Sequence, residues 1–294
     1  MSSTTTALPH VKLDHIVLLL PLEQLRNPPS WLTDYFTVIP GGKHAGGVTE
    51  NSLILLQDGV YIELIAFSEG VSDEQRAKHF WGKKPYGIID YAFTISVKTS
   101  EPTDIETEFE KLLVIWREAG VDEGLIPPRL AEGGRTRPDG TKIEWKIASP
   151  QDERARGTAN FWCIDVTPRN LRVPLSKETT THPSGASGVA SLSFNAPSDG
   201  NALLELSKLF GSYLKPSSSN DTGIITNSRF TIATPVDAHH AVGGGSELIL
   251  TEKGVVSSGK TGAVELKLAF STAGGESKVV RGDIEGQTVE LAFV

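Results

Sequence analysis

A histidine and a glutamate each stand alone among apolar residues near the start of the chain. The first segment reads Asp14-His15-Ile16, and the second reads Tyr61-Ile62-Glu63-Leu64-Ile65. Because a polar side chain buried in a sheet is costly without a partner, we expect His15 and Glu63 to interact. An imidazole and a carboxylate that meet across adjacent strands form half of a divalent-metal site.

Glu63 is also a candidate general base. A carboxylate in the middle of an apolar run, here at residues 60–67, is rarely buried without a partner. In a dry cleft, burial would raise the pKa of Glu63, so that it could remove a proton beside a carbonyl group. The alternative for His15 is a core histidine bonded to Glu63 or to the backbone.

Four further residues are candidates for the same site. His44 lies in a glycine-rich stretch, where it is either a catalytic acid or base lining a cleft or a solvated loop residue. Asn51 could orient a substrate oxygen or cap the strand that follows it. Arg169 and Arg172 lie near Asp165, so they could clamp a substrate carboxylate or form a structural ion pair.

Aromatic residues gather in one short segment further along the chain. Trp81 and Tyr86, beside His79 and Phe80, could cover an apolar ligand or serve only for packing. Cys163 is the only cysteine, which excludes an internal disulfide and a thiolate metal cage. We expect it to be a small buried hydrophobic residue.

Composition and charge exclude several classes of function. The 294 residues carry a formal net charge of −8 and contain no basic run, which argues against nucleic-acid and anionic-membrane partners. No apolar run approaches the roughly 20 residues that span a bilayer. The first eleven residues, Ser/Thr-rich without a secretory signal pattern, are expected to form a disordered arm. We therefore expect a cytoplasmic protein.

The order of expected elements begins with a strand, a helix and a hairpin. Residues 13–20 are expected to form a strand, residues 30–36 a helix and residues 40–47 a loop. Two apolar strands at residues 52–57 and 60–67 are joined by Asp58-Gly59, a strong hairpin signal. This order is that of a βαβββ unit.

The same order recurs twice. The helix expected at residues 103–119 has a capping box formed by Thr103 and Glu106 and an apolar stripe on one face. It lies among strands expected at residues 88–97, 142–148 and 160–166. In the last part of the chain, a helix capped by Ser198 lies among strands expected at residues 188–195, 224–234, 247–251, 264–270 and 288–293. Hairpin connections predict an α+β fold with antiparallel or mixed sheets.

The residues of the first unit resemble a known family. Leu13-Asp14-His15-Ile16-Val17-Leu18 at the start of a βαβββ unit resembles the vicinal oxygen chelate superfamily. The stretch at residues 40–51, followed by Gly59-Val60-Tyr61-Ile62-Glu63-Leu64-Ile65, resembles its glyoxalase-like domain family. The later segments Arg137-Pro138-Asp139-Gly140, Thr167-Pro168-Arg169 and His182-Pro183 also fit.

The resemblance implies a domain organisation. We expect a curled, barrel-like sheet at residues 12–175, made of modules at residues 12–67 and 87–167. A further βαβββ-like unit is expected at residues 188–294. Family membership of this kind predicts the fold more firmly than the reaction.

The resemblance also implies a metal site. In the superfamily, ligands come from the first and last strands of each module, which correspond to His15 and Glu63. The ion would be Zn, Mn, Fe or Ni, and it would bind two neighbouring substrate oxygens and stabilise an enolate. In the second module, Tyr91 and Cys163 occupy the matching positions, and neither is the usual ligand. Tyr91 is therefore a candidate substrate-binding residue, and Glu247 or His44 is a candidate additional ligand.

Two functions remain open at this stage. One is a lyase or isomerase with Glu63 and His44 as catalytic residues, assisted by a divalent metal. The other is a metal-free protein on the same scaffold that binds or sequesters a small molecule. Either takes a small-molecule partner, and a homodimer is a candidate assembly.

Overall fold

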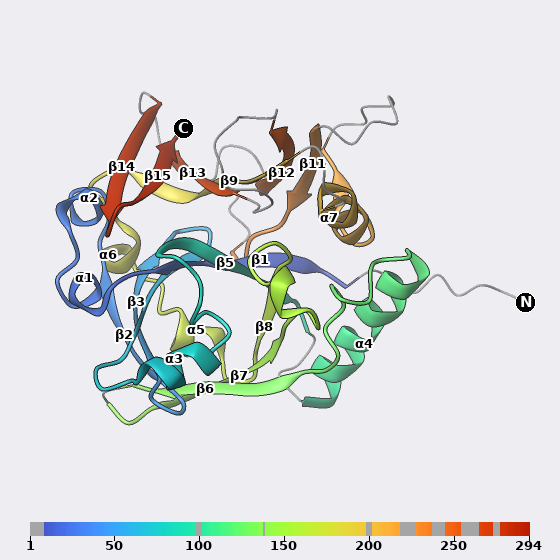
Figure 1. The fold of residues 1–294 in the computed structure, drawn as a ribbon, viewed down its shortest axis with the longest axis horizontal. Helices are drawn as coiled ribbons and strands as arrows, with labels where there is room; N and C mark the ends of the chain where they lie inside the picture. Colours follow the sequence, from blue (N-terminus) through green and yellow to red (C-terminus); the bar gives the residue numbers. More distant parts are fainter. Residues whose placement is uncertain are drawn as a thin grey trace, which may run out of the picture.

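The structure is a computed structural model that describes residues 9–97, 102–137, 139–197, 202–217, 227–236, 245–253, 265–272 and 277–294. Residues 1–8 of the expected N-terminal arm and Ser198 lie outside these residues, and the side chain of Thr103 is not described either. The chain forms two layers, a barrel made by the first half and an open sheet that covers one side of it (Figure 1).

Eight strands close into the barrel, in the order β1-β4-β3-β2-β6-β7-β8-β5. They are β1 (Val11–Leu19), β2 (Ile39–His44), β3 (Thr49–Leu55), β4 (Tyr61–Phe67), β5 (Gly87–Ile95), β6 (Ala131–Thr136), β7 (Lys142–Ala148) and β8 (Phe161–Asp165). β1 is parallel to β4, and β5 is parallel to β8, whereas β1 with β5 and β2 with β6 are antiparallel. Two equivalent four-stranded modules therefore meet edge to edge along both seams.

Helices connect the strands of the barrel. The first module contains α1 (Leu22–Arg26) and α2 (Ser30–Thr33), and α3 (Asp73–Lys78) leads to the second. The second contains α4 (Pro102–Glu118) and the short 3-10 helix η1 (Glu153–Ala155), and α5 (Arg169–Arg172) and α6 (Lys177–Thr180) lead to the open sheet. The apolar stripe of α4 is buried as its spacing predicts, through Ile105, Phe109, Leu112 and Trp116. No described helix is long and apolar enough to cross a membrane.

The open sheet repeats the pairing of the barrel. Its elements are β9 (Ala186–Pro197), α7 (Ala202–Gly211), β10 (Lys215–Pro216), β11 (Asn227–Ile232), β12 (Ser246–Lys253), β13 (Glu265–Thr272), β14 (Lys278–Ile284) and β15 (Gln287–Phe293). β9 is parallel to β12, β13 is antiparallel to β9, and β13 is parallel to β15. In the barrel, β1, β4, β5 and β8 pair in the same way as β9, β12, β13 and β15 do here. The open sheet therefore resembles a second pair of modules, of which the second module is one strand shorter within the described residues.

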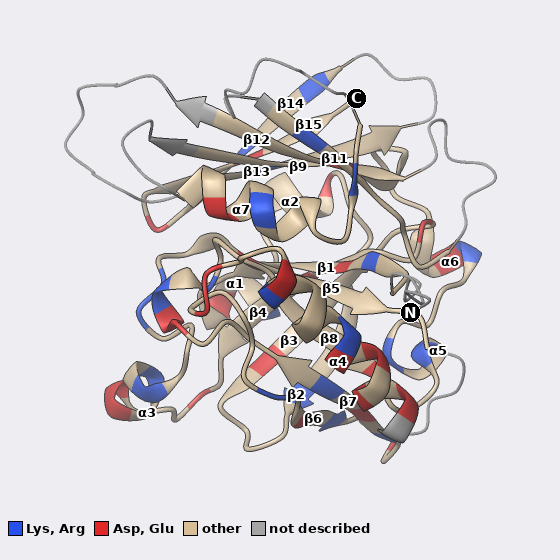
Figure 2. Ribbon diagram, turned by 90° about the vertical axis from the view of Figure 1, so that its right-hand side faces the viewer, with Lys and Arg blue, Asp and Glu red and all other residues tan. Residues whose placement is uncertain are grey.

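The main hydrophobic core lies between the two layers. Residues alternate between the two faces of a strand, so Leu13, Ile16 and Leu18 of β1 face this core, whereas Val17 and Leu19 belong to a cluster inside the barrel. Helix α7 lies between the layers (Figure 2). The expected α+β class with barrel-forming βαβββ modules is confirmed.

Three glycine-containing strands differ from expectation. The glycine-rich stretch expected to be a loop contains strand β2, which pairs with both β3 and β6. Strands β6 and β14 were not expected from the sequence, and both contain glycines. In β14, a side chain on Gly282 would meet the indole of Trp31, because a Cβ atom there would lie 2.3 Å from that ring.

The β3–β4 hairpin is tied to the open sheet by one carboxylate. Asp58 is buried, and its side chain accepts hydrogen bonds from the backbone N–H of Val60 and of Val189, each at 2.9 Å. Its backbone N–H donates to Ser187, and its carbonyl accepts from Val236. The turn that the sequence predicts is therefore also a junction between the layers.

Candidate functional site

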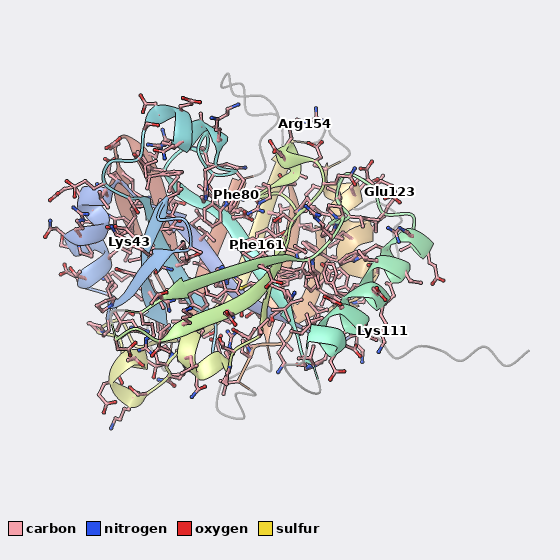
Figure 3. All side chains as sticks on the ribbon, turned by 90° about the horizontal axis from the view of Figure 1, so that it is seen from below. Lys43, Phe80, Lys111, Glu123, Arg154 and Phe161 are labelled. Atoms are coloured by element: carbon pink, nitrogen blue, oxygen red, sulfur yellow. The ribbon has the colours of Figure 1, made fainter. Side chains whose placement is uncertain are left out.

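The barrel encloses a cavity of about 250 Å³. Figure 3 shows the barrel from below, with two of the lining residues, Phe80 and Phe161, labelled. The polar lining residues include His15, His44, Thr49, Asn51, Glu63, His79, Arg135 and Arg172, and the aromatic ones are Tyr61, Phe80, Trp81, Trp145 and Phe161. Polar groups gathered in an apolar pocket are the usual form of a ligand site.

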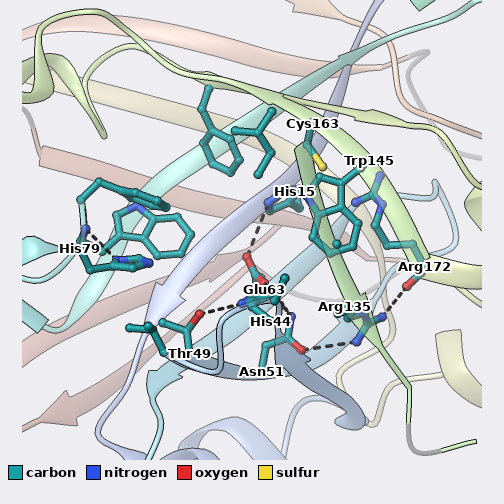
Figure 4. A pocket seen from close by; sticks show the side chains of 18 of the residues that line it. His15, His44, Thr49, Asn51, Glu63, His79, Arg135, Trp145, Cys163 and Arg172 are labelled. Atoms are coloured by element: carbon teal, nitrogen blue, oxygen red, sulfur yellow. Dashed lines mark hydrogen bonds and ion pairs between the residues drawn. The ribbon is translucent and has the colours of Figure 1, made fainter. Parts of the chain in front are cut away.

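His15 and Glu63 meet inside this cavity. They lie on the adjacent parallel strands β1 and β4, and the Nε2 atom of His15 is 3.6 Å from the Oε2 atom of Glu63 (Figure 4). Both side chains are buried. The imidazole stacks on the ring of Tyr61, with 4.6 Å between the ring centroids. The structure thus brings together the two residues that the sequence singled out.

A β-bulge orients the imidazole of His15. The pairing of β1 with β5 shifts register between Leu13 and His15, so Asp14 is the extra residue. The carboxylate of Asp14 lies 2.5 Å from Nδ1 of His15. A carboxylate on one ring nitrogen fixes the tautomer and leaves the other nitrogen, here Nε2, for a ligand.

The second oxygen of Glu63 faces two more candidates. Asn51 donates from Nδ2 to Oε1 at 2.6 Å, and Nε2 of His44 lies 3.4 Å from the same oxygen. The Nδ1 atom of His44 is 2.8 Å from the hydroxyl of Thr49. His44 is the last residue of β2, so it lies on a barrel strand and not in a loop.

The glycines of β2 make room for Asn51. The backbone N–H of Gly42 donates to Oδ1 of Asn51 at 3.0 Å. A Cβ atom on Gly41 would lie 2.0 Å from the same oxygen, so any side chain there would displace the amide. Glycine in this strand reflects the close approach of a functional side chain.

Glu63 is ionised, which corrects the expectation that a dry site would raise its pKa. Burial alone would raise the pKa, but the hydrogen bond and charge of His44, together with His15 and Asn51, lower it to about 2. A carboxylate with so low a pKa is a weak general base at neutral pH. It is better suited to binding a cation.

The two arginines expected near Asp165 form a structural network. Arg172 donates from Nη1 to Asp14 and to the hydroxyl of Tyr61, from Nη2 to Asp14 and Asp165, and from Nε to Asp165. These contacts use all five N–H donors of the guanidinium. Arg169 also pairs with Asp14 and Asp165. Neither arginine therefore has the role of a free clamp for a substrate carboxylate.

Two other candidates lie away from the cavity. The ring of Tyr91 packs against Phe194 of the open sheet, and its hydroxyl donates to the carbonyl of Thr158 at 2.9 Å. Glu247 lies on β12 of the open sheet and pairs with Arg229 at 2.9 Å. Tyr91 is therefore not a pocket residue, and Glu247 is not a ligand of a site in the barrel.

Cys163 lines the cavity next to His15. Its thiol, Asp14 and His15 offer ligand atoms within 4.8 Å of one another. However, Asp14 already bonds to His15, Arg169 and Arg172, and burial raises the pKa of the Cys163 thiol well above its usual value. We therefore do not assign a metal to this group, because both carboxylate oxygens of Asp14 already have partners.

The structure adds residues that sequence reasoning did not assign to the site. His79 lines the cavity, and burial, with the charges of Arg156 and His44, lowers its pKa to about 4. Its Nδ1 accepts a hydrogen bond from the backbone of Trp81, so the neutral ring carries its proton on Nε2. Trp81 also lines the cavity. This is the position expected if the aromatic segment covers an apolar ligand.

Gly133 of β6 gives Trp145 its position in the cavity wall. A Cβ atom at residue 133 would lie 2.3 Å from Nε1 of Trp145. Gly133→Ala should therefore displace the indole, change the tryptophan fluorescence spectrum and lower the free energy of unfolding by about 1–3 kcal/mol. Gly211→Ala is the matched control, since a Cβ atom there would meet only Phe230 at 3.7 Å. Equal, small changes in the two variants would contradict this assignment.

Comparisons with known proteins agree with this architecture. A family model described as a glyoxalase-like domain matches residues 13–210. A crystal structure of a hypothetical protein from Staphylococcus aureus is similar with a TM-score of 0.63 and 15% sequence identity, covering 97% of this chain and 100% of that one. At this identity the likeness concerns the fold alone.

Other similarities are weaker. A mutant of 4-hydroxymandelate synthase from Streptomyces coelicolor has a TM-score of 0.45 and 13% identity, covering 90% of this chain and 71% of that one. Methylmalonyl-CoA epimerase from Mycobacterium tuberculosis has a TM-score of 0.33 and 16% identity, covering 57% and 95%. No functionally curated protein matches the sequence.

Proposed function

The chain belongs to the glyoxalase-like domain family, and on this premise we propose that it is a small-molecule enzyme of the lyase or isomerase type. The active site would be the barrel cavity, with a divalent metal ion held by His15 and Glu63. The observation that carries the proposal is the convergence of these two buried side chains on one point of the cavity, with Nε2 and Oε2 separated by 3.6 Å.

The donor atoms fit a divalent ion. Two ligand atoms that each lie about 2.0–2.1 Å from one tetrahedral ion are about 3.4 Å apart. The 3.6 Å between Nε2 of His15 and Oε2 of Glu63 is close to this value. It is longer than a hydrogen bond. Asp14 holds the far nitrogen of His15, as carboxylates do for metal-bound histidines. The low pKa of Glu63 keeps the carboxylate ionised. Imidazole and carboxylate ligands suit Zn, Mn, Fe or Ni.

When bound, such an ion would polarise a substrate carbonyl as a Lewis acid. The protein's own groups would position the substrate and move the proton. The side chain of His44 is 20% exposed, compared with 4% for His15, so we assign it to proton transfer and not to the metal. In the neutral ring, its Nε2 would accept a proton from the carbon beside the carbonyl, the electron pair of the C–H bond would form a C=C bond, and the π pair of the carbonyl would move to its oxygen.

Neighbouring residues would support this transfer. The hydroxyl of Thr49 and the amide of Asn51 hold the imidazole of His44 in place. His79, neutral at pH 7, carries a proton on Nε2 and could donate a hydrogen bond to a substrate oxygen. The aromatic walls would keep water from the reacting carbon.

A metal-free binding protein is the second candidate. Its supporting observation is that the negative charge of Glu63 already has partners in Asn51 and two imidazoles. In that case the cavity would hold a small molecule without turnover.

Metal analysis separates the two candidates. We expect the purified protein to bind Zn, Mn, Fe or Ni, to lose the ion on chelation and to regain it on addition. Glu63→Gln should weaken metal binding at least about tenfold, since even residues behind the ligands contribute that much. Glu132→Gln is the matched control, because this carboxylate is on the cavity rim and its side chain is 77% exposed.

The same samples test the reaction. Wild-type protein should exchange the proton beside the carbonyl of its substrate with deuterated water, and His44→Gln should abolish this exchange. Metal binding unaffected by Glu63→Gln, or no binding of any of the four ions, would reject the metal site and favour the binding protein.

A further inference from the structure

Three arginines line the cavity, and two of them have carboxylate partners. Arg172 pairs with Asp14, and Arg156 pairs with Asp90 at 3.0 Å. Arg135, on β6, has no carboxylate within ion-pair distance among the residues that the structure describes. It is therefore the one lining arginine in this part of the chain whose charge is not neutralised by a direct partner.

The guanidinium of Arg135 is buried but only partly hydrogen-bonded. Arg135 is 6% exposed, and burial lowers its pKa. Nη2 donates to the carbonyl of Arg172 at 3.1 Å, and Nη1 makes a long contact of 3.4 Å with Oδ1 of Asn51 (Figure 4). Of the five N–H donors of a guanidinium, these contacts use two. Burying a charged group whose N–H donors lack acceptors costs free energy unless a ligand supplies those acceptors.

The rest of the cavity wall indicates what is attached to the anion. Its aromatic part is formed by Tyr61, Phe80, Trp81, Trp145 and Phe161. The volume of about 250 Å³ exceeds the roughly 150 Å³ of a cavity known to hold benzene. A single ring with a few additional atoms therefore fits, whereas a large conjugate such as a coenzyme thioester could place only its acyl end inside.

We propose that Arg135 binds the carboxylate of the substrate, and that the substrate is a small monocarboxylic acid with an apolar body about the size of one ring. One unpaired cation calls for one negative charge, and the planar guanidinium matches a carboxylate through two parallel hydrogen bonds. This inference rests on the proposed function for the location of the site, but it requires neither a metal nor turnover.

Binding of benzoate and benzamide to the full-length protein tests the proposal. The two probes have nearly the same shape, and only benzoate carries the carboxylate. Titration calorimetry and quenching of tryptophan fluorescence should show benzoate binding at least about tenfold more tightly, since a hydrogen bond to a charged group contributes about 1.5–3 kcal/mol. Equal binding of the two probes, or no benzoate binding up to about 10 mM, would overturn the proposal.

Variants of Arg135 test the contact itself. Arg135→Gln should reduce benzoate affinity at least about tenfold and leave benzamide affinity unchanged, because the lost interaction is with the charge. Arg135→Lys keeps the positive charge but lacks the planar pair of N–H donors, so it should give an intermediate loss of benzoate affinity. Arg137→Gln is the control, since it removes a nearby positive charge that does not line the cavity. If Arg135→Gln is unfolded by circular dichroism, Arg135→Lys decides, and wild-type affinity in that variant would overturn the proposal.

Chelated protein separates this proposal from the proposed function. Benzoate binding that persists after chelation and is lost in Arg135→Gln supports the arginine contact, whether or not a metal is present. Benzoate binding that disappears on chelation and is unchanged in Arg135→Gln places the carboxylate on the metal and overturns the proposal. If the metal analysis detects no bound ion but benzoate still binds and its binding depends on Arg135, only the proposed metal enzyme is rejected.

Discussion

Replacement of Asp14 by asparagine is expected to lower the free energy of unfolding by about 3–5 kcal/mol, the usual cost of removing one member of a buried ion pair. Asp14 is buried and pairs with Arg169, Arg172 and His15. Burial alone would raise its pKa, but these positive partners hold the pKa well below its usual value. Asparagine keeps the size but leaves the buried guanidinium of Arg172 and the half-buried guanidinium of Arg169 short of one negative charge.

Urea denaturation followed by circular dichroism measures this effect. Asp152→Asn is the matched control, because Asp152 pairs with the highly exposed Arg154, and exposed pairs contribute about 0–1 kcal/mol. The Asp14→Asn variant should also lose the orientation of His15, whose Nδ1 atom Asp14 holds. A loss of stability as small as that of the control would mean that solvent reaches the arginine network and replaces the missing charge.

The sequence predicts those parts of the fold that depend on local patterns. The apolar runs of β1 and β4, the Asp58-Gly59 turn and the stripe of α4 all follow from neighbouring residues. Pairing β1 with β4 then follows from the need of His15 and Glu63 for partners. The family resemblance supplies the barrel, which periodicity alone does not predict.

The remaining features depend on residues far apart in the chain. Glycine disfavours strands in isolation, yet β2 and β6 need it because Asn51 and Trp145 of neighbouring strands occupy the space of a side chain. Asp14 and Arg172 are 158 positions apart, so no local pattern shows that they pair. This pairing removes Arg172 from the candidate substrate contacts and leaves Arg135 in that role.

The electrostatics of Glu63 show the same limit. A dry environment was expected to raise the pKa, and burial does act in that direction. The opposite outcome depends on His44 and Asn51, whose positions are set by the pairing of β2, β3 and β4. The chemistry of a buried carboxylate is thus decided by its neighbours in the folded barrel, and residue type and burial alone are insufficient.

Asp58 should give the protein a stability component that is lost as the pH rises. Burial raises the pKa of its carboxyl group from 3.8 to about 6, because the two hydrogen bonds from Val189 and Val60 only partly offset the cost of burying the charge. The folded state therefore holds this proton more tightly than the unfolded state does. The contribution is complete below about pH 4 and disappears by about pH 6, and at about 1.4 kcal/mol per pKa unit it amounts to about 3 kcal/mol.

Comparison with Asp58→Asn isolates this contribution. Asparagine cannot ionise, so the stability of the wild-type protein relative to this variant should fall by about 3 kcal/mol between about pH 4 and pH 7. Asp152→Asn is again the control, because hydrogen bonds and the charge of Arg154 lower the pKa of Asp152 and give the opposite sign. A wild-type advantage that grows with pH would mean that Asp58 is ionised at the junction. The two backbone N–H groups would then outweigh burial, and the carboxylate would join the layers as an anion.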